Sequence, residues 1–148
     1  MIWKPNVTVA AVAVRNGKHL LVEETEDGKL VLNQPAGHLD EGESLLDAVV
    51  RETLEETAWH FVPEFLIGVY RWPHPEKGVT YLRFAFAGHV TGHEPGRTLD
   101  VGVVRAVWLT PQEIAQQAPR HRSPQVMRTL NDYLAGRRYP LDLLSEVL

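Results

Sequence analysis

The chain has 148 residues, of which 44% are hydrophobic and 23% charged; this ordinary composition excludes a disordered or low-complexity chain. Fifteen Lys and Arg residues against nineteen Asp and Glu residues give a formal charge of −4, which argues against nucleic acid or an anionic membrane as the partner. The lack of cysteine excludes disulfides, thiol catalysis and Cys-ligated metal sites. No apolar run is long enough to cross a membrane, so we expect one cytoplasmic domain over residues 1–148.

Hydrophobic periodicity predicts strands through much of the chain. Residues 7–14 are almost continuously apolar and rich in valine, which indicates a buried strand. Asn16-Gly17 is a typical hairpin turn before the returning strand, whereas Pro35 and Gly37 are expected to interrupt the chain as a loop. In chain order, the predicted strands cover residues 7–14, 20–24, 30–32, 64–72, 79–88 and 101–109.

Three helices are predicted among these strands. From Ser44 the hydrophobic period changes from 2 to 3.6, so Ser44 is expected to cap a helix that runs to about Thr57, with Asp47 completing a capping box. Thr110 and Ser123 are expected to cap two further helices. Because strands outnumber long helices, the pattern predicts an α/β sandwich with a mixed sheet rather than a doubly wound parallel sheet.

The first predicted helix carries an acidic stripe. At about 100° per residue, Glu55 and Glu56 lie about −60° and +40° from Glu52, so the three carboxylates share one face. Such stripes are usually solvated, but Glu52 and Glu56 are like charges at i,i+4, and the helix dipole disfavours acids in the last turn. A divalent cation would reverse both penalties. Oxygen ligands without cysteine suit Mg²⁺ or Mn²⁺.

In the loop and the helix, glycine, arginine and glutamate residues follow one another at fixed intervals. The spacing reads G-x5-E-x7-R-E, then two residues, then E-E, and it resembles the box of the Nudix hydrolase family, G-x5-E-x7-R-E-U-x-E-E-x-G-U. The sequence departs from that motif at Thr53, where a bulky aliphatic residue is usual, and at Ala58, where glycine is usual. Neither departure removes a carboxylate. The matching residues are Gly37, Glu43, Arg51, Glu52, Glu55 and Glu56.

The resemblance implies a fold and a reaction. The fold is an α/β/α sandwich with a mixed sheet, and the reaction is the hydrolysis of a nucleoside diphosphate linked to another group, with Mg²⁺. It also implies that Arg51 orients the carboxylates through an ion pair with Glu43. A later loop often supplies one more carboxylate, for which Asp100 and Glu94 are the candidates. The implied metal ligands are Gly37 through its carbonyl, Glu52, Glu55 and Glu56, with Asp100 as a possible addition, and Glu55 is also a candidate base.

Short tracts outside the box resemble the NudJ-type phosphatase subgroup of this family. Examples are Asn33 to Leu39 and Arg137 to Leu141. The subgroup implies removal of phosphate from nucleoside di- and triphosphates or from the thiamine-precursor pyrimidine pyrophosphate. We expect arginines to bind the phosphate tail, aromatic residues to stack on a heterocycle, and polar residues beside the box to reach substrate. These candidates are Arg83 and Arg122, Trp72 and Tyr81, and Gln34, His38 and Asn33, respectively.

Other functions stay open at this point. A Nudix hydrolase acting on ADP-ribose or oxidised nucleotides is the main alternative. A non-catalytic nucleotide- or RNA-binding module usually loses box glutamates, and all of them are present here. An RNA pyrophosphohydrolase would favour a basic groove, which a charge of −4 does not suggest. The expected partner is a small-molecule pyrophosphate, with no nucleic acid and no membrane, and the protein is expected to be a monomer or homodimer.

Overall fold

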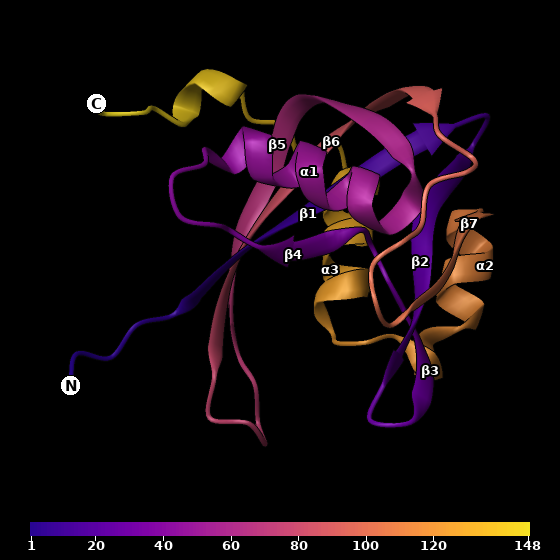
Figure 1. Ribbon diagram of the computed structural model, residues 1–148, viewed down its shortest axis with the longest axis horizontal. Helices are drawn as coiled ribbons and strands as arrows, with labels where there is room; N and C mark the ends of the chain where they lie inside the picture. The colour runs from indigo at the N-terminus through magenta and orange to yellow at the C-terminus, as the bar shows by residue number, and fades with distance from the viewer.

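A mixed sheet forms the centre of the molecule (Figure 1). The computed structural model describes residues 1–148. The strand order is β3-β2-β1-β6-β5, with β4 pairing β1 and β7 pairing β2. Strands β1 and β6 are parallel, whereas the other pairs are antiparallel. The strands are β1 (Asn6–Arg15), β2 (Lys18–Glu26), β3 (Lys29–Asn33), β4 (Ala36–His38), β5 (Trp59–Pro73), β6 (Thr80–His93) and β7 (Val103–Leu109).

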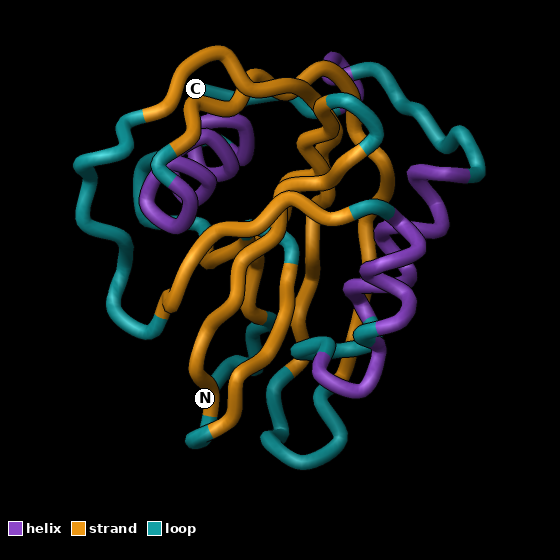
Figure 2. The backbone as a smooth tube through the Cα atoms, turned by 90° about the vertical axis from the view of Figure 1, so that its right-hand side faces the viewer, coloured by secondary structure: helices purple, strands orange, loops and turns teal.

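Helices cover both sides of the strands, which confirms the predicted α/β/α sandwich. Figure 2 shows one α-helix on one side of the strands and the other two α-helices on the opposite side. None of them is long and apolar enough to span a membrane. The helices are α1 (Leu45–Thr57), α2 (Pro111–Gln116) and α3 (Gln125–Leu134), with short 3-10 turns at Ala118–Arg120 and Leu141–Leu143.

The continuous apolar run of β1 is explained by burial on both faces. Val9 and Ala11 pack on the α1 side with Val49. Ala10 and Val12 face the other way, into a second cluster with residues of β5 and β6. A strand that is covered on both faces has no polar face, so its sequence does not alternate. This buried strand anchors β4 and β6, which both contribute to the site.

All six predicted strands are present and β4 is an addition; β7 begins two residues later than predicted, whereas the other five are longer than predicted. Asn16 and Gly17 have φ values of 53° and 75°, as the predicted hairpin turn requires. Strands β5 and β6 extend well beyond residues 64–72 and 79–88. The loop predicted around Pro35 and Gly37 is wrong in part, because Ala36–His38 pairs with β1 as strand β4. That pairing is a long-range contact with no local signal in a three-residue segment.

The ends of the helices follow the predicted caps in part. The Ser44 hydroxyl accepts a hydrogen bond from the Asp47 N–H at 3.0 Å, but the reciprocal half of the capping box is absent because aspartate is shorter than glutamate. Thr110 caps α2 with a complete capping box. Pro124, not Ser123, is the N-cap of α3. Ala58 ends α1 with a φ of 62°, in the left-handed conformation for which the family motif has glycine.

Candidate active site

Arg51 on α1 connects the carboxylates of the box. Its Nε and Nη2 donate to the two oxygens of Glu43 at 3.0 and 2.7 Å. Its Nη1 donates to Glu52 at 2.8 Å and to Glu55 at 2.7 Å, and Nη2 also reaches the His38 carbonyl. The hydrogen bonds that Arg51 donates to Glu43 are the largest cause of an Arg51 pKa raised above its usual value. The expected ion pair with Glu43 is present, and the same guanidinium orients two helix carboxylates.

Gly37 on β4 lies directly against Glu52. A Cβ atom at position 37 would overlap the Glu52 carboxyl group, so this contact leaves room for glycine alone. The Glu52 side chain is only 12% exposed as a result of its place between α1 and β4. Burial raises the pKa of Glu52 to about 7, although the hydrogen bond from Arg51 acts in the opposite direction.

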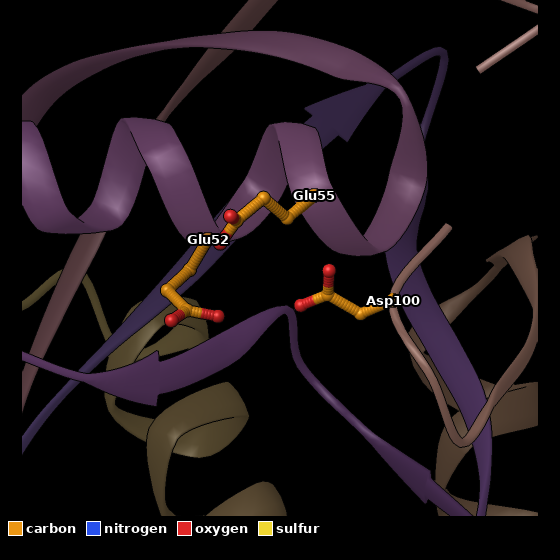
Figure 3. A group of neighbouring side chains, drawn as sticks. All are labelled: Glu52, Glu55 and Asp100. Carbon is orange, nitrogen blue, oxygen red and sulfur yellow. The ribbon is translucent and has the colours of Figure 1, made fainter. Parts of the chain in front are cut away.

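The loop between β6 and β7 supplies one more carboxylate. The Asp100 N–H donates to the Glu55 carbonyl at 3.0 Å, which fixes the loop to the end of α1. Carboxylate oxygens of Glu52, Glu55 and Asp100 lie within 4.8 Å of one another (Figure 3). Burial and the charge of Glu55 raise the pKa of Asp100. The other candidate, Glu94, instead contacts His60 at 2.6 Å.

Glu56 is buried on the inner side of this group, with 8% of its surface exposed. Its Oε1 accepts a hydrogen bond from the Ala36 N–H at 2.8 Å. Burial raises the pKa of Glu56 to about 9, and the charges of Glu24 and Glu52 add to the shift. A buried carboxylate among other carboxylates is costly unless a cation or a proton compensates it.

The donor set fits a hard divalent cation. Three carboxylates already lie within the reach of one ion, and Glu56 and the Gly37 backbone line the same cavity. The raised pKa values of Glu52, Glu56 and Asp100 have burial as their largest cause, with nearby carboxylates adding to it. Oxygen-only donors of this kind suit a hard cation.

A cavity of about 480 Å³ opens beside the carboxylates. It lies where β4, β6, α1 and the start of α3 meet, and it collects side chains from all parts of the chain. The predicted site residues that line it are Gly37, His38, Glu52, Glu56, Trp72, Tyr81, Arg83, Asp100 and Arg122, together with Asn33.

Comparison with known proteins identifies the chain. Residues 4–130 match the model of the NUDIX domain. The chain belongs to the Nudix family. It is 40% identical to "Phosphatase NudJ" of Escherichia coli strain K12 over 145 residues, which cover 98% of this chain and 94% of that protein. The Shigella flexneri protein of the same name has the same identity and coverage.

Solved structures agree with this assignment. A NUDIX hydrolase from Nitrosomonas europaea is 52% identical, with a TM-score of 0.95 and coverage of 97% of this chain and 98% of that one. A MutT NUDIX hydrolase from Burkholderia pseudomallei, at 20% identity and a TM-score of 0.73, covers 88% of this chain and 98% of its own and shares the fold. The chain is a Nudix phosphohydrolase.

One expectation about the residues around the cavity needs correction. Gln34 does not line the cavity: its amide donates to the Val126 carbonyl at 2.9 Å and its oxygen accepts from Arg83, so both ends are used internally. Trp72 and Tyr81 do line the cavity, where their rings stack with centres 5.8 Å apart.

Several cavity residues had no signal in the sequence. Glu24 and Glu26 lie on β2, and Lys77 and His74 lie near the tip of the β5–β6 hairpin. Lys77 contacts Glu26 at 3.3 Å, across a separation of 51 positions. Charged residues in hairpins are ordinarily solvated, so only the folded arrangement reveals that these face the Nudix site.

Metal binding to the Nudix site should stabilise the protein more strongly as pH rises. Folded-state pKa values of about 7 for Glu52 and about 9 for Glu56 mean that the fold retains protons which the unfolded chain has lost. Stability of the metal-free protein should therefore fall as pH rises from about 4.5 to about 9. A cation needs the ionised carboxylates, so its stabilising effect grows over the same range.

Melting temperatures measured with EDTA and with Mg²⁺, at about pH 6 and about pH 8.5, check this expectation. The Mg²⁺-induced rise should be larger at the higher pH. The double variant Glu52→Gln/Glu56→Gln should lose most of the rise at both pH values. A rise of equal size in wild type and double variant would contradict the assignment of these carboxylates.

Substitution of Gly37 by alanine should displace Glu52 and lower kcat by about tenfold or more, because the new methyl group takes the place of its carboxyl group. Gly96→Ala is the matched control, since no atom lies within 4 Å of its Cβ position and its φ is not in the left-handed region. Steady-state kinetics of both variants test the expected loss of kcat. Similar rates for the two would show that this contact does not set the position of Glu52.

Proposed function

We propose that this Nudix enzyme removes the terminal phosphate from nucleoside di- and triphosphates or from small heterocycle pyrophosphates, such as the thiamine-precursor pyrimidine pyrophosphate. Mg²⁺ or Mn²⁺ is the proposed cofactor. The observation that carries this proposal is one cavity with the carboxylates of Glu52, Glu56 and Asp100, two arginines and a stacked aromatic pair on its walls. The name of the relatives, "Phosphatase NudJ", supports the same reaction.

The cation site of the proposal consists of Glu52, Glu55 and Glu56, the Gly37 carbonyl and Asp100. A divalent cation bound there supplies positive charge that neutralises phosphate oxygens and acidifies the attacking water. Arg51 holds Glu52 and Glu55 in place through its hydrogen bonds. Within this set the helix carboxylates need no movement to assemble, because their arrangement is already fixed in the folded chain.

Glu55 is the proposed acceptor of the proton from the attacking water. Its side chain is 30% exposed, compared with 12% for Glu52, so water reaches it more easily. As water attacks the terminal phosphorus, the bond from this phosphorus to the bridging oxygen breaks. The rest of the substrate departs with that oxygen, and the attacked phosphoryl group becomes orthophosphate. Asp100, beside Glu55, is the alternative acceptor of the proton.

The walls of the cavity are the proposed binding surface for the rest of the substrate. The ring planes of Trp72 and Tyr81 are tilted by only 17° from each other, and a heterocycle can extend this aromatic stack. Arg83 and Arg122 are the candidates for contacts with the phosphate tail. His38, whose ring centre lies 6.5 Å from that of Tyr81, lines the same cavity.

Product analysis tests the proposal directly. GDP, the pyrimidine pyrophosphate and ADP-ribose are compared side by side, with and without Mg²⁺. Orthophosphate should appear from the first two substrates and only with the cation. Fastest turnover of ADP-ribose, with AMP and ribose phosphate as products, would overturn the substrate assignment and leave the Nudix chemistry intact.

A further inference from the structure

The two arginines on the cavity wall differ in their charge balance. Arg122 is paired with Glu24 at 2.8 Å and with Glu26, so its charge is already neutralised by β2. Arg83 is 98% buried and has no carboxylate among its hydrogen-bond or salt-bridge partners. A buried guanidinium without a counterion is costly, and such an arrangement is rare unless an anion completes it.

Neutral side chains hold the Arg83 guanidinium in place. Its Nη1 donates to Gln34 Oε1 at 3.2 Å and to Thr129 Oγ1 at 3.1 Å. The Gln34 amide is in turn fixed by the Val126 carbonyl. These acceptors orient the group but do not neutralise it. The group remains charged at neutral pH, because burial lowers the pKa of Arg83 only to about 10.

The edge of the Arg83 guanidinium formed by Nη2 and Nε has hydrogen-bond donors without a partner. Nη2 donates one hydrogen bond, to Asn33 Oδ1 at 3.1 Å, and Nε donates none. Nε–H and Nη2–H point in the same direction, and this edge of arginine binds carboxylate and phosphate oxygens in pairs. Both Arg83 and Asn33 line the cavity that also holds Glu52 and Glu56.

We propose that Arg83 recognises a phosphate oxygen of the substrate from the inner wall of the cavity. The neutral side chains around it preserve its charge for that purpose. Arg122, already paired with two carboxylates, serves mainly to connect β2 to the start of α3. The proposal rests on the phosphate-bearing substrate of the proposed function, and it names the side chain that selects for it.

Asn33→Asp gives a sharp test, because it provides an internal carboxylate for Arg83 with almost no change of shape. The probe is methylenebisphosphonate with Mg²⁺, bound to the full chain and measured by titration calorimetry. We expect Asn33→Asp to raise the melting temperature, since it supplies the missing counterion. We expect the same variant to weaken binding of the probe by about tenfold or more, because the new carboxylate occupies the edge that would bind phosphate.

Two further variants separate this mechanism from other causes. Ser123→Asp places the same charge on the same cavity wall, where aspartate can still accept the hydrogen bond from the Gln125 N–H, and it should weaken binding by no more than about threefold. Arg83→Lys keeps the charge but loses the paired N–H groups, and it should weaken binding by about tenfold or more.

Three results would overturn the proposal. One is wild-type affinity in Asn33→Asp or in Arg83→Lys, which would make Arg83 a purely structural residue. Another is an equal loss in Asn33→Asp and Ser123→Asp, which would indicate only a general charge effect. The third is no binding of the probe to the wild type. Methylenebisphosphonate carries the paired phosphorus groups of all substrates compared above, so a preference for ADP-ribose would overturn the proposed function without affecting this test.

Discussion

Glu56→Gln is expected to lower kcat by about 100-fold or more while the protein remains folded. Glutamine has nearly the same shape, and its side-chain oxygen can still accept the hydrogen bond from the Ala36 N–H. The variant loses the negative charge that the proposed cation site requires. Without a cation, burial disfavours the ionised form of Glu56 and raises its pKa to about 9, so neutral glutamine does not destabilise the metal-free fold.

The two effects of Glu56→Gln therefore have opposite signs. Activity with saturating Mg²⁺ should fall, whereas the melting temperature in EDTA should equal or exceed that of the wild type. Glu64→Gln is the control, since it removes an exposed carboxylate that contacts only His89. Near-normal turnover of Glu56→Gln would refute the assignment of Glu56 as a ligand.

Arg51→Lys should lower kcat by about tenfold or more and reduce the free energy of unfolding by about 1–2 kcal/mol. The guanidinium donates to Glu43, Glu52 and Glu55 at once, through all three of its nitrogens. A single ammonium group cannot make this set of contacts. Because 27% of the Arg51 side chain is exposed, water screens part of the lost interaction. The effect on stability therefore stays smaller than for a fully buried pair.

Arg128→Lys is the matched control for this experiment. Arg128 also pairs with an acidic residue at i+4 on a helix, Asp132, but its side chain is 60% exposed. It should change stability by less than about 0.5 kcal/mol and leave kcat unchanged. Kinetics and urea unfolding of the two variants are compared. Equal effects in both would show that Arg51 is an ordinary surface ion pair rather than the organiser of the carboxylates.

The sequence alone determined the parts of the protein that depend on nearby residues. The α1 helix, the Ser44 cap and the hairpin at Asn16-Gly17 follow from periodicity and turn chemistry. The box was equally accessible, because Arg51 contacts Glu52 and Glu55, which lie one and four positions further along the same helix. The resemblance to the Nudix box rests on that same continuous segment.

Only the tertiary structure decided the parts that depend on contacts between distant segments. It made Ala36–His38 a strand, placed Asp100 rather than Glu94 beside the carboxylates, and turned Gln34 away from the cavity. It also gave Arg122 carboxylate partners on β2 and left Arg83 with none. The physical reason is the same in each case: the charge balance and burial of a side chain depend on neighbours many positions away, and no local pattern of residues encodes them.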